Sequence, residues 1–457
     1  MLVNPWDTWQ LGLYQRVDSL KDPEASVDES TRKKAALVLI DDLAAMVAAI
    51  DEPELRALSA SSPRVSPGAE CSHVNGTKSG RSWAAFVNAV ASNWHELDEG
   101  YRPVPCHGGL YTLPAVMAEV QAVGGPLNDV YRGLVCGYEV VSAYARLFPA
   151  PRPLALHPHA SIAAMGAAAG VATVRESRGS VVEVSTSIAS TLGALGPFSH
   201  ATEGKLVRNA WAGQGAVSGF HAVELAMAGI HGSVNSAVDV LSGVLGYQLD
   251  ESELENQWDR WAILDGYHKS YACCQYVHSA VEAVAQLVAG PLAEVNYHDI
   301  SAIEVQTHPL AMPLDDPSPK TVLGAKFSVP HTVAAVLATK STQADTFSDR
   351  WVSDVEVDRL RQLVRMSIFV GNLEPPHDRP ARVTVTLRDG QTFSAECSSA
   401  IGGPDRPMSA DQVMEKAESL VRSRMPRFMD MAQDLVEGRV DPQRAFGDFL
   451  SAMWTRS

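Results

Sequence analysis

A run of small, uncharged residues limits how this chain can fold. Residues 161–174 read SIAAMGAAAGVATV, in which alanine and glycine predominate and no side chain carries a charge. The run is shorter than the roughly 20 apolar residues that are needed to span a bilayer. Because it has almost no polar face to present to water, we expect a helix that is packed closely on all sides within a helical core.

Similar stretches continue through the first 265 or so residues. Apolar side chains recur there at helical spacing, and several stretches begin with a polar residue. The segments that predict helices are 28–51, 82–94, 108–125, 127–148, 159–177, 181–195 and 209–230. In the first of them, Asp41 and Asp42 are expected on the solvent side. The 457 residues exceed the roughly 250–300 that one core usually serves, so about two domains are expected.

The pattern changes near residue 296. Residues 297–309 are rich in β-branched side chains, and residues 381–399 predict a hairpin with Asp389-Gly390 as its turn. A later helix is expected to begin at Ser409, which is a suitable N-cap. The helices predicted in this half are 329–340, 358–369 and 409–438. We therefore expect a mainly α protein, with a large all-helical domain and a smaller α+β domain.

Composition narrows the class of partner. The net charge of −16 disfavours broad contact with nucleic acid or a membrane surface, because both need a positive face. Neither a secretory signal nor a membrane-spanning run is predicted, so we expect a cytoplasmic protein. The six cysteines form no disulfide framework, and the sequence has no CxxC or HExxH motif for zinc or an iron–sulfur cluster. His157 and His159 are paired as metal ligands can be, but the sequence identifies no third ligand.

Polar residues interrupt the apolar pattern in a few places. One is HELDEGYRPVPCHGGL (95–110), which is either a loop that turns the chain or one wall of an active site. Four further stretches, 155–161, 203–213, 266–283 and 325–335, carry cations or imidazoles, namely His157, His159, Lys205, Arg208, Lys269, His278 and His331. With Glu96, Asp98 and His107 they predict a cationic pocket without metal. Such a pocket suits a polycarboxylate that loses a proton next to a carboxylate.

The order of these motifs resembles that of the MmgE/PrpD family, which includes 2-methylcitrate dehydratase, cis-aconitate decarboxylase and iminodisuccinate epimerase. The motifs are AAFVNAVASNWHELDEG, CHGG, LHPHAS, VRNAWAG, KSYACCQYVHSAVEA and AKFSVPHTVAA. The resemblance implies a helical domain (1–268), an α+β lid domain (269–405) and C-terminal helices (406–457) that complete the helical domain. It also implies a homodimer, a small carboxylate substrate, no metal, no cofactor, and an active site at the domain junction.

Several positions match the catalytic residues of that family. Glu96, with Asp98 as the second candidate, matches an acid that faces the pocket. His107 matches a family histidine, although Gly108 follows it where the family has proline. His157 matches the histidine of the next His-Pro motif.

Other matching positions are expected to bind substrate. Arg208 stands where many members have lysine, and because arginine stays charged it is suited to clamping a carboxylate. Lys269 matches the lysine that opens the lid motif. Cys274 and His331 stand where the decarboxylases have histidine and tyrosine, and Tyr101 is expected to contact the substrate as well.

These matches imply a metal-independent lyase that removes water from a small β-hydroxy acid. His107 or His157 would take the proton next to a carboxylate, and Glu96 or the other histidine would protonate the leaving hydroxyl. The departures at Cys274 and His331 weaken the decarboxylase alternative, whereas epimerisation in the same pocket stays open. A carboxylate-binding protein that has lost the reaction is a further alternative. Each of these residues also has a plainer interpretation: the histidines as structural, the acids as solvated loop residues, the cations as surface residues and the cysteines as buried packing.

Overall fold

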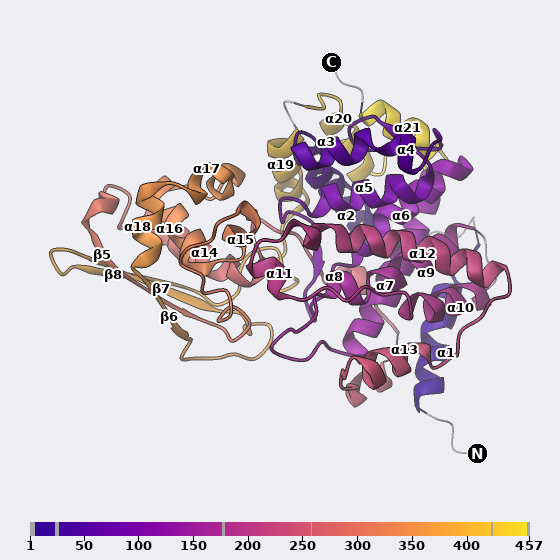
Figure 1. Ribbon diagram of the computed structural model, residues 1–457, viewed down its shortest axis with the longest axis horizontal. Helices are drawn as coiled ribbons and strands as arrows, with labels where there is room; N and C mark the ends of the chain where they lie inside the picture. The colour runs from indigo at the N-terminus through magenta and orange to yellow at the C-terminus, as the bar shows by residue number, and fades with distance from the viewer. Residues whose placement is uncertain (1–4, 23–26, 176–178, 257, 422–423, 455–457) are drawn as a thin grey trace.

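The computed structural model describes residues 5–22, 27–175, 179–256, 258–421 and 424–454, most of which are helical. Figure 1 shows a large helical body and a smaller part that contains a sheet. A mainly α fold with a smaller α+β part is therefore confirmed.

Helix α9 (Ala163–Val174) is the buried helix that the small residues predicted, since every one of its residues is buried. A side chain at Gly170 would meet Val116 Cγ2 at 2.6 Å and the Gly133 carbonyl oxygen at 2.9 Å. Glycine therefore lets α9 lie against the two helices that carry those residues. The helices packed on α9 are α6 (Gly108–Val123), α7 (Leu127–Leu147), α10 (Gly179–Ser190) and α12 (Trp211–Met227).

The helical body includes segments from both ends of the chain. Helix α19 (Ala410–Val421) packs on α2 (Glu29–Ala48), and α20 (Phe428–Val436) and α21 (Phe446–Met453) follow it. Ser409 caps α19 as predicted, because its Oγ accepts a hydrogen bond from Gln412 N at 3.2 Å. Other helices of the body are α1 (Pro5–Asp18), α3 (Pro53–Ala60), α4 (Ser62–Val65), α5 (Arg81–Asn93), α8 (Pro158–Ser161), α11 (Ser199–Thr202) and α13 (Ser236–Val238).

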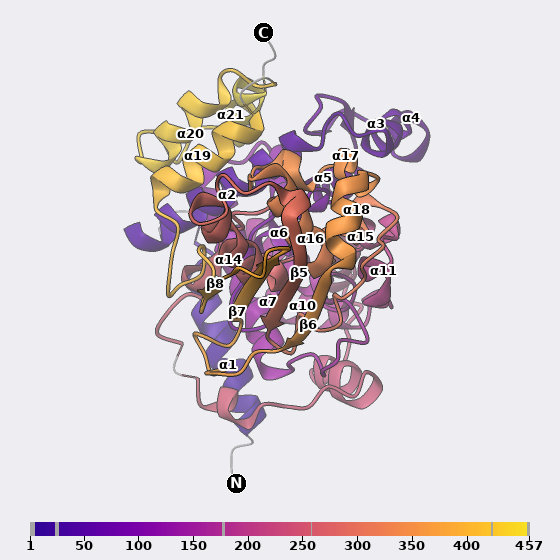
Figure 2. The same cartoon turned by 90° about the vertical axis from the view of Figure 1, so that its left-hand side faces the viewer.

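The smaller part is a four-stranded sheet with helices on one face, as Figures 1 and 2 show. The strand order is β6-β5-β7-β8, with β6 parallel to β5 and the other neighbours antiparallel. The hairpin at Asp389-Gly390 is present, and Gly390 has a φ of 89° in its turn. The elements are β5 (Ile300–Thr307), β6 (Val364–Ile368), β7 (Ala381–Leu387), β8 (Thr392–Cys397), α14 (His278–Ala289), α15 (Val322–Lys326), α16 (Val329–Thr339), α17 (Asp349–Val352) and α18 (Val355–Gln362).

Short strands connect the two parts. β3 (Gly100–Tyr101) pairs antiparallel with β4 (Gly266–Tyr267). This pairing lays the polar stretch 95–110 against the segment that opens the α+β part. Another short pair, β1 (Cys71–Ser72) with β2 (Lys78–Ser79), lies within the helical body.

Three local predictions were wrong. The helix predicted over 409–438 is divided into α19 and α20, and residues 424–427 belong to neither helix. The helix predicted over 358–369 ends at Gln362, and the chain continues as β6, because pairing with β5 overrides the helical pattern. Asp41 and Asp42 are buried rather than solvent-facing, and Asp41 is paired with His268 and Lys416. Of the helix predicted over 159–177, residues 176 and 177 lie outside the described residues.

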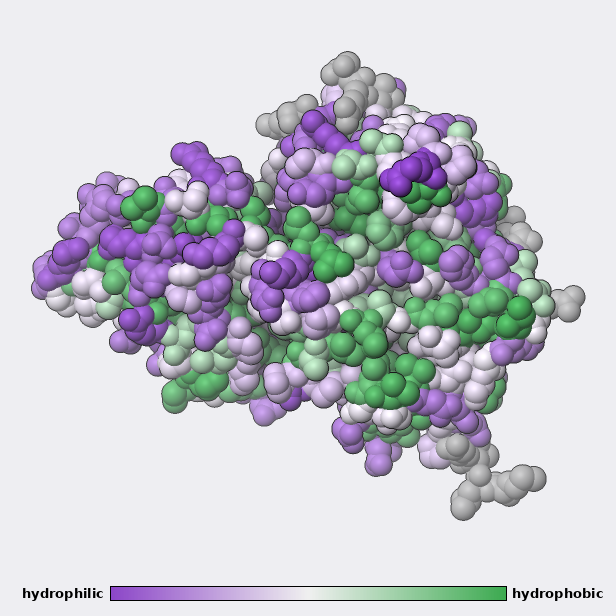
Figure 3. All heavy atoms as spheres, in the orientation of Figure 1, coloured by the Kyte–Doolittle hydropathy of each residue, from purple (hydrophilic) through white to green (hydrophobic). Residues whose placement is uncertain are grey.

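The surface in Figure 3 is mixed, with hydrophobic side chains gathered around α12 and the segment after it. Met227, Ile230 and Val234 are exposed there. Within the part of the chain that the structure describes, no helix is both long enough and apolar enough to cross a membrane.

Candidate active site

A small cavity lies where the helical body meets the α+β part. Its volume is about 50 Å³, which leaves room for only a few water molecules. It is lined by Glu96, Tyr101, Pro105, Cys106, His107, Leu154, His157, Pro158, Phe198, Arg208, Tyr267, Lys269, Cys274, Gln275, Tyr276, Phe327 and Arg379. Among these described residues three are permanent cations and only Glu96 is a carboxylate. The cavity is therefore locally positive in a chain whose net charge is −16.

The stretch 95–110 forms one wall of this cavity. Glu96 has a φ of 58°, a left-handed conformation that residues other than glycine rarely adopt, and the turn buries its side chain. His107 directly precedes α6, whose first residue, Gly108, lies on the Tyr138 ring. A Cβ at Gly108 would come within 2.6 Å of that ring, which explains why a small residue follows the histidine.

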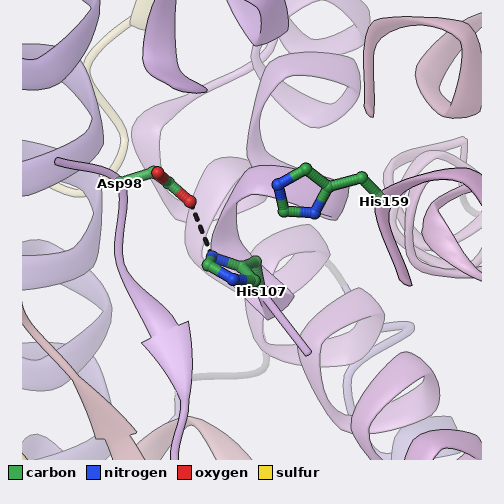
Figure 4. Close-up of side chains that lie close together, drawn as sticks. All are labelled: Asp98, His107 and His159. Carbon is green, nitrogen blue, oxygen red and sulfur yellow. Dashed lines mark hydrogen bonds and ion pairs between the residues drawn. The ribbon is translucent and has the colours of Figure 1, made fainter. Parts of the chain in front are cut away.

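His107 and Asp98 form a hydrogen-bonded pair in this wall (Figure 4). His107 Nδ1 lies 2.6 Å from Asp98 Oδ2 and 2.8 Å from the Glu99 carbonyl oxygen. Because both partners are acceptors, Nδ1 carries a hydrogen, and Nε2 of the neutral ring keeps its lone pair. Burial opposes the charge on Asp98, but Lys269 and His107 outweigh it and hold the pKa of Asp98 well below its usual value. This arrangement is that of a general base with a supporting carboxylate.

Glu96 bridges two cations of the cavity. Its Oε1 accepts a hydrogen bond from Arg208 Nη1, and its Oε2 accepts one from Lys269 Nζ at 3.2 Å. Lys269 also donates to Asp98 Oδ1 at 3.1 Å, and Arg208 donates to Asn93 Oδ1. All of these groups are buried, so their charges are compensated by one another rather than by water. The cations that were expected to hold substrate thus hold Glu96 in this structure.

His157 lies beside Arg208 and is surrounded by donors. Its Nε2 is 3.2 Å from Arg208 Nε, and its Nδ1 is 3.3 Å from the backbone nitrogen of His159. Burial, reinforced by Arg208, lowers the pKa of His157 well below its usual value. The ring is therefore neutral at neutral pH. A neutral imidazole accepts at only one of its two nitrogens and can orient Arg208 with it, but its remaining N–H is too weak an acid to protonate a leaving group.

Asp98, His107 and His159 are close enough to be considered as metal ligands (Figure 4). One potential ligand atom from each lies within 4.8 Å of the others, and His159 Nε2 has no hydrogen-bond partner among the described residues. However, Lys269 already donates to Asp98, and burial together with Arg208 lowers the pKa of His159. A metal cation here would be repelled by these two permanent positive charges. The same surroundings favour an anion.

Tyr101 and Cys274 line the cavity, and their neighbours constrain them. The Tyr101 hydroxyl accepts a hydrogen bond from Arg146 Nη1 at 2.7 Å, so this polar end is already engaged. Burial raises the pKa of Cys274 to about 12. Cys274 is therefore a thiol that packs in the wall rather than a nucleophile.

The structure does not bring His331 to the cavity. His331 lies in α16, where its Nδ1 faces Arg361 Nη1 at 3.3 Å. Its backbone nitrogen donates to Ser328 Oγ, the cap of that helix. The position is thus a packed helix start, which corrects the expectation that His331 contacts substrate. Lys205, which is exposed, and His278 also do not line the cavity.

Several lining residues were not predicted from the sequence, and four of them, Tyr267, Gln275, Tyr276 and Arg379, have a hydroxyl, amide or guanidinium group. Tyr267, Gln275 and Tyr276 belong to the polar stretch 266–283, in which the cations and histidines stood out instead. Arg379 comes from the loop before β7, and nothing in its surroundings, HDRPAR, distinguishes it from a surface arginine. Its burial depends on contacts far along the chain, which local pattern cannot reveal.

A second pair of buried acids lies behind the His107 wall. The Glu99 backbone nitrogen donates to Asp42 Oδ1 at 3.2 Å, and the Glu99 carboxylate accepts from Gly109 N at 2.5 Å and from the Tyr138 hydroxyl at 2.9 Å. Burial raises the pKa of Glu99 to about 7. Burial and the Glu99 charge also raise the pKa of Asp42 well above its usual value. This pair therefore tends to keep a proton near neutral pH.

Profiles of two known domains match this chain. The MmgE/PrpD N-terminal domain matches residues 23–255, and the MmgE/PrpD C-terminal domain matches residues 271–439. The chain belongs to the MmgE/PrpD family. The domain boundary at residue 268, which the resemblance implies, falls in the interval between the two matches and stays a prediction. Cis-aconitate decarboxylase from Homo sapiens is 22% identical over 351 residues, which cover 73% of this chain and 71% of that relative. The MmgE/PrpD family contains dehydratases and decarboxylases, so membership supports an enzyme of this general type.

Proposed function

We propose that this protein is a lyase that eliminates water from a small β-hydroxy polycarboxylate, as a 2-methylcitrate dehydratase does, without a metal or cofactor. The observation that carries the proposal is the Asp98–His107 pair beside a cavity lined by Arg208 and Lys269. When a base removes a proton next to a carboxylate, negative charge develops on that carboxylate. A base with cations next to it is the arrangement that this step requires.

The geometry supports a mechanism with one proton carrier. His107 Nε2 takes the proton from the carbon next to the substrate carboxylate, and Asp98 stabilises the imidazolium that forms. Arg208 and Lys269 stabilise the enediolate. The electron pair of the broken C–H bond then forms the carbon–carbon double bond while the C–O bond of the hydroxyl breaks. The departing hydroxide takes the proton back from His107 and leaves as water.

In this mechanism Glu96 and His157 position the cations and do not carry protons. Glu96 holds Arg208 and Lys269 together by ion pairs until a substrate carboxylate replaces its own. His157 accepts a hydrogen bond from Arg208 Nε and so fixes the plane of the guanidinium. These roles replace the expectation that one of the two protonates the leaving group, because the N–H of neutral His157 is too weak an acid and Glu96 is a carboxylate paired with two cations.

Substrate entry requires the cavity to widen. Its volume of about 50 Å³ is far below the roughly 300–1,000 Å³ of a typical ligand pocket. A larger cleft of about 760 Å³ is lined by residues of both parts, including His95, Leu97 and Lys326. These are sequence neighbours of Glu96 and Phe327, which line the small cavity. A movement of the 95–97 turn that releases Glu96 from its cations would join the two spaces.

Decarboxylation is the second candidate, and the similarity to human cis-aconitate decarboxylase favours it. The cations would hold a carboxylate in the same way, and the His107 imidazolium would protonate carbon after carbon dioxide leaves. Epimerisation needs a second proton carrier on the other face of the substrate. His157 is the other histidine lining the cavity, and its neutral state argues against that reaction.

The test is to identify the product by proton NMR. Chelator-treated protein is incubated with citrate, 2-methylcitrate, cis-aconitate and related β-hydroxy acids, alongside the variants His107→Gln and His331→Gln. Dehydration gives a new alkene signal that wild type and His331→Gln produce and His107→Gln does not. Loss of carbon dioxide identifies a decarboxylase instead. If the NMR signals of a candidate acid shift when protein is added but no product forms, the enzyme proposal is contradicted and a carboxylate-binding protein is supported.

A further inference from the structure

Arg379 is a buried cation whose charge is incompletely paired. Its side chain is 4% exposed and lines the cavity. Nη1 donates to Gln275 Oε1 at 2.5 Å and Nη2 donates to the Arg102 carbonyl oxygen at 3.1 Å, so both of these acceptors are neutral. Nε has no hydrogen-bond partner among the described residues.

The nearest carboxylate to Arg379 is shared. Asp378 Oδ2 lies 3.5 Å from Arg379 Nε, but Asp378 already accepts from Arg102 Nη2 at 2.6 Å and from Arg102 Nη1 at 3.4 Å. Two guanidinium groups thus depend on one carboxylate. Burial, together with Arg102, lowers the pKa of Arg379. A buried charge in such surroundings is costly, and an anion in the cavity would relieve that cost.

The positive charge of the cavity is also in excess. Arg208, Lys269 and Arg379 line it, whereas Glu96 alone among the described lining residues is a carboxylate. Glu96 is bound to Arg208 and Lys269, which leaves Arg379 without a carboxylate partner among the described residues of the wall. Among the described residues, Asp98 pairs with Lys269 and His107 rather than with Arg379. An anionic ligand is what this excess charge would attract.

We propose that Arg379 binds a second carboxylate of the substrate, distinct from the one that Arg208 and Lys269 hold. This proposal rests on the proposed function and assigns one residue to the second carboxylate of its polycarboxylate substrate. Arg208 belongs to the helical body, whereas Arg379 belongs to the α+β part. A substrate with carboxylates at both sites therefore bridges the two parts across the cavity, and a monocarboxylate would lack this second anchor.

The test compares two probes of nearly the same shape. Glutarate has two carboxylates, and glutaramate has an amide in place of one of them; neither has a hydroxyl to eliminate. Isothermal titration calorimetry on the full chain should show that wild type binds glutarate about 10–100-fold more tightly than glutaramate. This is the usual gain for a charged hydrogen-bonded pair. Arg379→Gln should lose this preference. Arg365→Gln, which changes an exposed arginine on β6 of the same part, should keep it.

A second variant neutralises Arg379 without removing it. Gln275→Glu places a carboxylate where the amide oxygen now accepts from Arg379 Nη1. The new carboxylate should keep the guanidinium in place and pair with its charge. The preference for glutarate should therefore again be lost. This variant keeps the test decisive if Arg379→Gln does not fold.

The outcomes separate this proposal from the proposed function. If wild type prefers glutarate and both Arg379→Gln and Gln275→Glu keep that preference, the role of Arg379 is refuted while the carboxylate site stands. Equal affinity of wild type for the two probes refutes the second carboxylate. If wild type binds neither probe, the carboxylate class itself is contradicted, and the proposed function fails with it.

Discussion

Replacing Asp98 by asparagine keeps the shape of the wall and removes the charge that supports His107. The carboxylate lies 2.6 Å from His107 Nδ1, and an imidazolium–carboxylate pair at about 4 Å between charge centres contributes roughly 4 kcal/mol at an effective dielectric constant of about 20. This corresponds to a loss of at most about 10³-fold in rate. The Glu99 carbonyl oxygen, at 2.8 Å, still accepts the Nδ1 hydrogen and preserves the useful tautomer. We therefore expect kcat to fall by about 10²–10³-fold.

The assay is steady-state turnover of the substrate that the product screen identifies, with folding checked by near-ultraviolet circular dichroism. Asp41→Asn is a matched control, because Asp41 Oδ2 lies 2.7 Å from His268 Nδ1 in a buried pair that does not line the cavity. Asp41→Asn should lower stability but leave kcat of the folded enzyme near that of wild type. Wild-type turnover in folded Asp98→Asn would refute the role of the pair.

Four further changes test other parts of the account. Glu96→Gln releases Arg208 and Lys269 from their ion pairs, so calorimetry should show tighter glutarate binding than in wild type, and weaker binding would contradict the proposed competition. Burial raises the pKa of Glu99 from 4.5 to about 7, so its protonated form stabilises the fold at low pH and this stability is lost as the pH rises through that interval. Between pH 4.5 and 8, the free energy of unfolding of wild type, measured with urea, should therefore fall by about 3 kcal/mol more than that of Glu99→Gln. The same pH dependence in both proteins would refute the assignment. Cys274→Ala should retain most of the turnover, because burial raises the pKa of this thiol to about 12, and complete inactivation would point to a nucleophile. His331→Gln should cost about 1 kcal/mol of stability through its contact with Arg361 and leave KM unchanged, whereas a large rise in KM would place it in the substrate site.

The helical core could be predicted from sequence because its signal is local. The small residues of α9, the periodic helices around it, the Asp389-Gly390 turn and the Ser409 cap all depend on neighbouring residues. Segment 358–369 was predicted incorrectly because β6 is a strand only through its pairing with β5. Asp41 looked like a surface acid because its partners, His268 and Lys416, lie more than 200 residues away.

In the candidate site, too, some features follow from the local sequence and others depend on contacts between distant parts of the chain. His107, His157, Glu96, Arg208 and Lys269 stood out in the sequence as polar residues in apolar surroundings, and the structure gathers them around one cavity. Which of them carries protons depends on contacts that a sequence cannot show. The two N–H donors beside His157 and the two acceptors beside His107 Nδ1 give these histidines opposite chemistry. Arg379 has no local signal at all, since its burial arises only in the folded chain.

The central claim is that His107 removes a proton from the carbon next to a substrate carboxylate. The most direct measurement follows the exchange of that proton for deuterium by NMR, with chelator-treated protein in deuterated water. We predict that wild type and His331→Gln exchange the proton, and that His107→Gln does so at least about 10²-fold more slowly. Exchange at the wild-type rate by folded His107→Gln would contradict the account.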